Sequence, residues 1–89
     1  MTTTFTFFTD NAHGWLRVEA AEWIKSGFRP DDFSRYSYRD LRGNVYLEED
    51  CDAPKFVDAY RRKFGIPQIV DTFLEGRAFI RNLPRLRHG

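Results

Sequence analysis

The chain has 89 residues, a formal net charge of +1 and one cysteine. This length predicts one small domain over residues 1–89. A single cysteine excludes an intrachain disulfide and favours a reducing compartment, so we expect a cytoplasmic protein. No stretch approaches the roughly 20 apolar residues of a membrane span, and the first residues lack the basic region of a secretory leader.

The first 18 residues predict a β-hairpin. Residues 3–9 are rich in Thr and Phe, which suit a half-buried strand. Residues 10–14 supply turn-forming types, and a second strand begins at Trp15.

A short helix is expected over residues 20–26. Its apolar side chains, with Phe28 just beyond it, are predicted to face the core through Trp23 and Ile24. Gly27 is the expected terminator, and Pro30 prevents the helix from continuing.

A second hairpin is predicted from residues 35–39 and 45–50, which flank a turn that contains Gly-Asn. Tyr36 and Tyr38 are two positions apart, so we expect them to share one face of the first strand.

A second helix follows, because apolar residues recur at helical spacing: Ala53, Phe56, Val57, Tyr60 and Phe64. Asp52 is expected to cap its first amides, and Gly65 with Pro67 to end it.

Residues 69–74 and 77–80 predict a third hairpin around Glu75-Gly76, and residues 84–89 a short basic tail. The expected fold is therefore α+β with the order ββαββαββ. Its simplest layer arrangement is an antiparallel sheet with two helices packed on one face.

Four carboxylates occur within residues 48–52, which we call the acidic segment: Glu48, Glu49, Asp50 and Asp52. Their mutual repulsion requires water, the chain's own arginines, a partner or a cation nearby. Residues 31–60 carry eight acids and four bases, whereas residues 61–89 carry two acids and seven bases. We therefore expect the two regions to lie side by side and neutralise each other.

Three interpretations of the acidic segment remain open. Carboxylates are the ligands of Mg²⁺ or Ca²⁺, but strand alternation would divide them between faces and the EF-hand pattern is missing, so no metal or cofactor is predicted. In the second interpretation Asp52 and Asp50 cap the helix while the other acids pair with arginines. The third is a patch that binds a partner.

No enzyme motif is present in the chain. His13 lies in a predicted turn, and no nucleophile can be recognised in the sequence around it, so we do not expect it to be a general base. Cys51 stands beside carboxylates, which should raise the pKa of its thiol, although the helix terminus acts oppositely. The prediction is a protein that is not an enzyme.

A strand that interleaves tyrosines with arginines can stack nucleobases and hold phosphate. Residues 35–39 have this pattern, and further bases follow at Arg77, Arg81, Arg85 and Arg87. The neighbouring acids would repel a polyanion, so nucleic-acid binding is the alternative rather than the leading prediction.

Three motifs together resemble a known family. They are residues 13–16 (HGWL), 36–38 (YSY) and 46–52 (YLEEDCD), followed by Phe56 and Ala59-Tyr60. Over roughly residues 5–82 the chain resembles short, uncharacterised proteins carried by bacteriophages and other mobile elements. The resemblance implies a bacterial host and no catalytic residue. It also implies a role in blocking a host defence protein, as an anti-CRISPR does.

The leading hypothesis is a non-enzymatic inhibitor, a monomer or homodimer, whose acidic surface binds a basic, nucleic-acid-binding host protein. The candidate partner-binding residues are Glu48, Glu49, Asp50, Tyr36, Tyr38, Arg39, His13 and Trp15. The alternatives are a small nucleic-acid-binding regulator that uses the Tyr/Arg strand and basic tail, and a metal-dependent enzyme built on the carboxylates.

Overall fold

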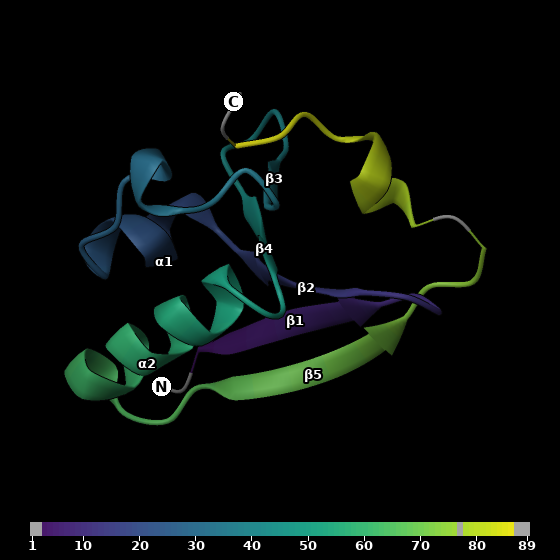
Figure 1. Cartoon of the computed structure of the whole chain (residues 1–89). Helices are drawn as coiled ribbons and strands as arrows, with labels where there is room; N and C mark the ends of the chain where they lie inside the picture. Colours follow the sequence, from purple (N-terminus) through teal and green to yellow (C-terminus); the bar gives the residue numbers. More distant parts are fainter. Residues whose placement is uncertain (1–2, 77, 87–89) are drawn as a thin grey trace.

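The structure is a computed structural model that describes residues 3–76 and 78–86. It is an α+β fold with a five-stranded mixed sheet (Figure 1). Its elements are β1 (Thr4–Thr9), β2 (Gly14–Val18), α1 (Ala20–Lys25), η1 (Pro30–Asp32), β3 (Tyr38–Arg39), β4 (Val45–Glu48), α2 (Asp52–Phe64), β5 (Gln68–Phe73) and η2 (Phe79–Asn82). None of the helices in the described ranges has the length and apolar character needed to cross a membrane.

The strand order is β3-β4-β2-β1-β5. The pairs β1–β2, β2–β4 and β3–β4 are antiparallel, as predicted, but β5 runs parallel to β1. The prediction of a wholly antiparallel sheet is therefore wrong at this edge. The reason is that α2 is a helical crossover. It carries the chain from the end of β4 back to the opposite end of the sheet, so that β5 runs in the same direction as β4 and β1.

The predicted third hairpin is also wrong in the described residues. After β5 the chain forms the short 3₁₀ helix η2 instead of a returning strand, while Arg77 lies outside the described residues. Ala78 and Ile80 are buried against Trp15 and Tyr46, on the other face of the sheet from α2. Burying these apolar groups carries the chain away from β5 and leaves the outer edge of that strand without a hairpin partner.

The larger core cluster lies on the face of the sheet that the two helices cover. On this face Phe7 of β1 lies opposite Leu16 of β2, and Leu16 lies opposite Leu47 of β4. Its buried members are Phe5, Leu16, Val18, Phe33, Val45, Leu47, Ala53, Phe56 and Tyr60. Trp23 of α1 packs against the same cluster, whereas Ile24 is 60% exposed, contrary to the expectation that it faces inward.

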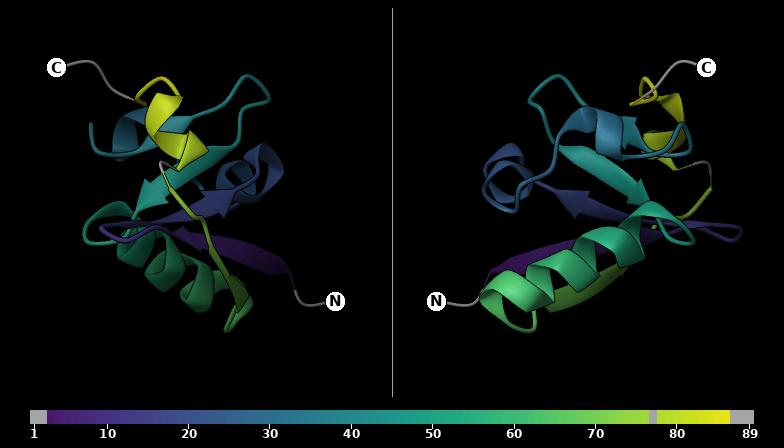
Figure 2. Two further views of the ribbon diagram at one scale, coloured as in Figure 1. Left: turned by 90° about the vertical axis from the view of Figure 1, so that its right-hand side faces the viewer. Right: turned by 60° about the vertical axis from the view of Figure 1, so that its left-hand side comes forward.

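The opposite face of the sheet carries a second, aromatic cluster. Residues next in sequence to the first cluster point this way, so Trp15 and Tyr46 are buried here together with Tyr38, Ala78 and Ile80. In the left view of Figure 2 the C-terminal segment (yellow) lies above the first two strands and α2 (green) below them. The C-terminal segment therefore covers the face that the helices leave open.

Both predicted helices form: α1 ends at Lys25, two residues before the predicted Gly27, and α2 ends at Phe64, directly before the predicted Gly65. Gly27 has φ +88° and Gly65 has φ +93°, which is backbone that L side chains rarely adopt. The predicted second hairpin is shorter than expected: β3 is only Tyr38–Arg39, and β4 ends at Glu48.

The predicted cap of α2 is wrong. The residue before the helix is Cys51, and Asp52 is its first helical residue, only 3% exposed. The Asp52 carboxylate accepts hydrogen bonds from the Ser34 N–H (2.9 Å to Oδ2), the Ser34 hydroxyl (2.7 Å) and the Ser37 hydroxyl. Asp52 thus ties the loop before β3 to the start of α2, instead of capping its own helix.

We expect Asp52→Ala to lower the free energy of unfolding by about 2–4 kcal/mol, because it leaves the half-buried donors of Ser34 and the buried hydroxyl of Ser37 without an acceptor. Urea denaturation followed by circular dichroism measures this. The matched control is Asp50→Ala, two positions earlier, whose exposed side chain should contribute less than about 1 kcal/mol. Equal losses in the two variants would contradict the role of Asp52.

Candidate functional site

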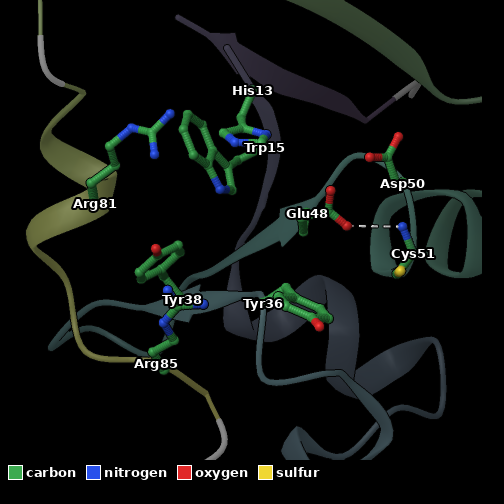
Figure 3. A pocket seen from close by; sticks show the side chains of 9 residues that line it. All are labelled: His13, Trp15, Tyr36, Tyr38, Glu48, Asp50, Cys51, Arg81 and Arg85. Atoms are coloured by element: carbon green, nitrogen blue, oxygen red, sulfur yellow. Dashed lines mark hydrogen bonds between the residues drawn. The ribbon is translucent and has the colours of Figure 1, made fainter.

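A cavity of about 340 Å³ opens on the aromatic face of the sheet. It lies between the strands and the C-terminal segment, and its lining residues come from far apart in the chain (Figure 3). They are His13, Trp15, Tyr36, Tyr38, Glu48, Asp50, Cys51, Arg81 and Arg85. This aromatic pocket is our candidate functional site.

Two buried rings form the floor of the aromatic pocket. Trp15 is 2% exposed and Tyr38 is 7% exposed, and their ring centres are 6.5 Å apart in an edge-on arrangement. Tyr36 is 47% exposed. The expectation that Tyr36 and Tyr38 share a strand face is wrong, because the chain turns at residues 35–36 and β3 starts only at Tyr38. The turn nevertheless places both rings on the same cavity.

The C-terminal segment forms one wall and is held to β3 by its backbone. The Arg39 N–H donates to the Pro84 carbonyl (3.0 Å), and the Leu86 N–H donates to the Ser37 carbonyl (2.9 Å). Residues 84–86 of the expected basic tail therefore run beside the sheet, whereas residues 87–89 lie outside the described residues.

Both arginines of the aromatic pocket interact with the chain itself. Arg81 donates from Nε to the Asp10 carboxylate (2.9 Å), and its guanidinium lies 5.2 Å from the centre of the Trp15 ring. Arg85 donates to the Arg35 carbonyl (2.9 Å) and lies 4.8 Å from the Tyr38 ring. Their charges are thus already engaged by a carboxylate, a carbonyl or an aromatic face.

The carboxylates of the pocket are less occupied. One oxygen of Glu48 accepts the Cys51 N–H (3.0 Å), whereas the exposed Asp50 side chain makes no hydrogen bond or ion pair with the described residues. In the described ranges no ion pair joins Glu48, Glu49 or Asp50 to an arginine. The basic C-terminal segment does lie beside these acids, since Arg81 and Arg85 line the same pocket as Glu48 and Asp50, but Arg81 pairs directly with Asp10 of the first hairpin.

The structure brings six of the eight predicted partner-binding residues to this pocket: His13, Trp15, Tyr36, Tyr38, Glu48 and Asp50. Glu49 is not among its lining residues, and Arg39 lines a separate cavity of about 290 Å³ beside Asp40 and Leu41. Arg81 and Arg85 were not in the predicted partner-binding set and were named only among the bases of the nucleic-acid alternative. Their only signal was the basic composition of the last 29 residues, which does not say where an arginine folds back.

The geometry supplies no activated nucleophile at Cys51. Desolvation, and then the charges of Glu48 and Asp52, raise the pKa of this exposed thiol. A thiol with a raised pKa stays protonated at neutral pH and is a weak nucleophile. Across residues 3–76 and 78–86, no three His, Cys, Asp or Glu side chains gather in a way that could hold a metal ion.

Comparisons with family models, with curated proteins and with solved structures found no match. The resemblance to phage and mobile-element proteins therefore stays a prediction from the three motifs.

The contact between Asp10 and Arg81 should make stability depend on pH. Hydrogen bonds from Arg81, and then from the N–H groups of His13 and Ala12, hold the pKa of the Asp10 carboxyl well below its usual range. Because the folded pKa lies below the unfolded value of about 3.9, Asp10 stabilises the fold above about pH 4, and this stabilisation is lost as the pH falls further.

We therefore expect Asp10→Asn to lower the melting temperature at neutral pH, with a difference from the unaltered protein that narrows between about pH 4 and pH 2. Thermal unfolding followed by circular dichroism measures it. The exposed Asp31→Asn is the control and should change little at any pH. A deficit for Asp10→Asn that stays constant down to about pH 2 would argue against a charge effect.

Proposed function

We propose that this chain is a non-enzymatic binding protein that takes a basic side chain of a protein partner into the aromatic pocket. The observation that carries the proposal is that the arginines of the pocket have more partners within the chain than its carboxylates do. Arg81 and Arg85 are engaged within the chain, whereas Glu48 keeps free acceptor capacity and Asp50 has no partner among the described residues. The charge that the pocket can still accept is therefore positive.

The lining of the pocket suits a guanidinium or ammonium group. Such a cation is attracted to an aromatic face and forms short hydrogen bonds with carboxylates. Tyr36 offers an accessible ring, and Glu48 and Asp50 come from the junction of β4 and α2 on the opposite side of the cavity from the arginines (Figure 3). The cavity lies at the small end of the range for ligand sites, which suits one long side chain more than an extended ligand.

The partner class we propose is a protein with a basic, nucleic-acid-binding surface. Exposed carboxylates would speed its association by electrostatic steering and compete with its polyanion. The narrower proposal, inhibition of a host defence protein in the manner of an anti-CRISPR, is supported by the resemblance to short phage proteins.

A titration with capped tripeptides tests the pocket directly, with arginine at the centre of one and glutamate at the centre of the other. We expect nuclear magnetic resonance to show chemical-shift changes around Trp15 and Tyr36 with the arginine peptide only. Asp50→Lys should weaken this binding by at least about tenfold, or 1.4 kcal/mol. Glu49→Lys makes the same charge change one residue away, outside the pocket lining, and should weaken it much less.

The comparison between these neighbouring positions decides the outcome. If Asp50→Lys binds the arginine peptide as well as Glu49→Lys does, with both proteins folded, the pocket is not the cation site. Glu48→Gln checks whether the charge of Glu48 contributes to binding of the arginine peptide. This substitution keeps an acceptor for the Cys51 N–H and removes only the charge.

Nucleic-acid binding is a second candidate, favoured by one specific observation. The guanidinium of Arg35 lies 5.3 Å from the ring of the exposed Tyr36, and the Arg35 carbonyl accepts from Arg85. Two bases beside an exposed ring can hold a nucleotide. Glu48 and Asp50 on the same cavity would repel its phosphates, so we favour the protein partner.

Fluorescence titration with single-stranded and double-stranded oligonucleotides separates the two candidates. We expect no saturable binding at low ionic strength. Tight binding that weakens as salt rises, and that is lost in Tyr36→Ala, would favour the nucleic-acid function instead.

A further inference from the structure

The outer edge of β5 is exposed on the side of the sheet away from β3. Among the described residues β5 pairs with β1 alone, and in Figure 1 it lies along the border of the sheet. Five of its six residues are exposed. An edge of this kind presents unpaired backbone groups to any extended chain.

The pairing with β1 shows which backbone groups are free. The Gln68 N–H donates to the Thr3 carbonyl (3.3 Å), and the Leu74 N–H donates to the Thr9 carbonyl (2.7 Å). Because backbone groups alternate in direction along a strand, the even-numbered positions from 68 to 74 face β1. The N–H and C=O groups of Ile69, Asp71 and Phe73 therefore point outward.

The side chains of β5 do little to block a new strand. Ile69 is 42% exposed, Val70 47% and Phe73 56%. Edge strands that avoid pairing usually carry proline, lysine or a bulge, and β5 contains none of these. Its one charged residue is Asp71.

Asp71 indicates what kind of strand fits. The register with β1 places Ile69, Asp71 and Phe73 on one face, so the carboxylate stands between two exposed apolar side chains. An incoming strand places one side chain directly beside each of them, and opposite charges stabilise such a pair. A second copy of β5 cannot provide this, because β5 contains no basic residue to lie beside Asp71 in any register.

We propose that the outer edge of β5 accepts an extended segment of a different protein as a sixth strand. The segment carries a lysine or arginine beside Asp71 and apolar side chains two residues to either side of it. Backbone hydrogen bonds at positions 69, 71 and 73 hold the segment, and Asp71 with its two apolar neighbours selects it. This surface is separate from the aromatic pocket, so the inference stands independently of the proposed function.

Amide hydrogen exchange measured by nuclear magnetic resonance tests the proposal residue by residue. The probe is a capped heptapeptide, Thr-Ile-Thr-Lys-Thr-Ile-Thr, with a control peptide that has glutamate in place of lysine. We expect the lysine peptide to slow exchange of the amides of Ile69, Asp71 and Phe73. The amides of Val70 and Thr72, which already face β1, should change little.

The matched control swaps the charges of strand and peptide. The lysine peptide should bind at least fivefold more tightly than the glutamate peptide, and Asp71→Lys should reverse that preference. Unchanged preference in folded Asp71→Lys, or no binding of either peptide at millimolar concentration, would overturn the proposal. Light scattering of the free protein tests whether a second copy of the chain occupies the edge instead. A dimer in which the amides of residues 69, 71 and 73 are already protected from hydrogen exchange would show that β5 pairs with itself and would overturn the proposal.

Discussion

The buried carboxylate of Asp52 is the constraint on which the candidate site depends. It accepts hydrogen bonds from Ser34 and from the Ser37 hydroxyl, and that hydroxyl in turn accepts the Glu48 N–H (3.0 Å). Ser37 lies between the two tyrosines of the pocket, and Asp52 follows Cys51 directly. One carboxylate therefore positions the turn before β3, the end of β4 and the start of α2, because a buried charge has to be surrounded by donors.

A second contact closes the aromatic pocket and decides its polarity. Asp10 lies in the first hairpin turn, where its other oxygen accepts the N–H groups of Ala12 and His13. By also accepting Arg81 it fastens the C-terminal segment over the sheet and occupies a guanidinium that would otherwise oppose the acidic segment. The pocket is lined by equal numbers of arginines and carboxylates, yet each arginine has a partner within the chain, whereas Asp50 has none among the described residues. Local pairing, not net charge, therefore determines which ligand charge suits it.

The two proposed surfaces share a chemical preference although they lie in different parts of the sheet. The aromatic pocket is built over β2, β3 and β4, whereas β5 is the strand farthest from β3. Each offers a carboxylate together with an accessible apolar or aromatic group: Asp50 and Tyr36 both line the pocket, and Asp71 and Phe73 share one face of β5. Basic segments of protein partners are the ligands that both arrangements favour.

The sequence by itself determined the elements whose signals are local. Turn residues follow β1 directly, apolar residues repeat along α2 at helical spacing, and Gly27 and Gly65 end their helices because φ there is positive. Sequence also drew attention to most of the pocket residues, since aromatic and acidic motifs stand out. The sequence did not show which of these side chains lie together in space. The predicted strand was continued through residues 35–36, where the structure has a turn, so the expected alternation of side chains did not apply there.

Only the tertiary structure decided the parallel pairing of β5, the path of the C-terminal segment and the partners of the charges. Asp10 and Arg81 are 71 positions apart, and Asp52 meets Ser34 across 18. No local pattern encodes such contacts, because a carboxylate in sequence is compatible with any donor that the fold brings near. The path of the C-terminal segment follows from burying Ala78 and Ile80 on the aromatic face, which carries Arg81 to Asp10. Among the described residues, Glu48 and Asp50 then form no ion pair with an arginine.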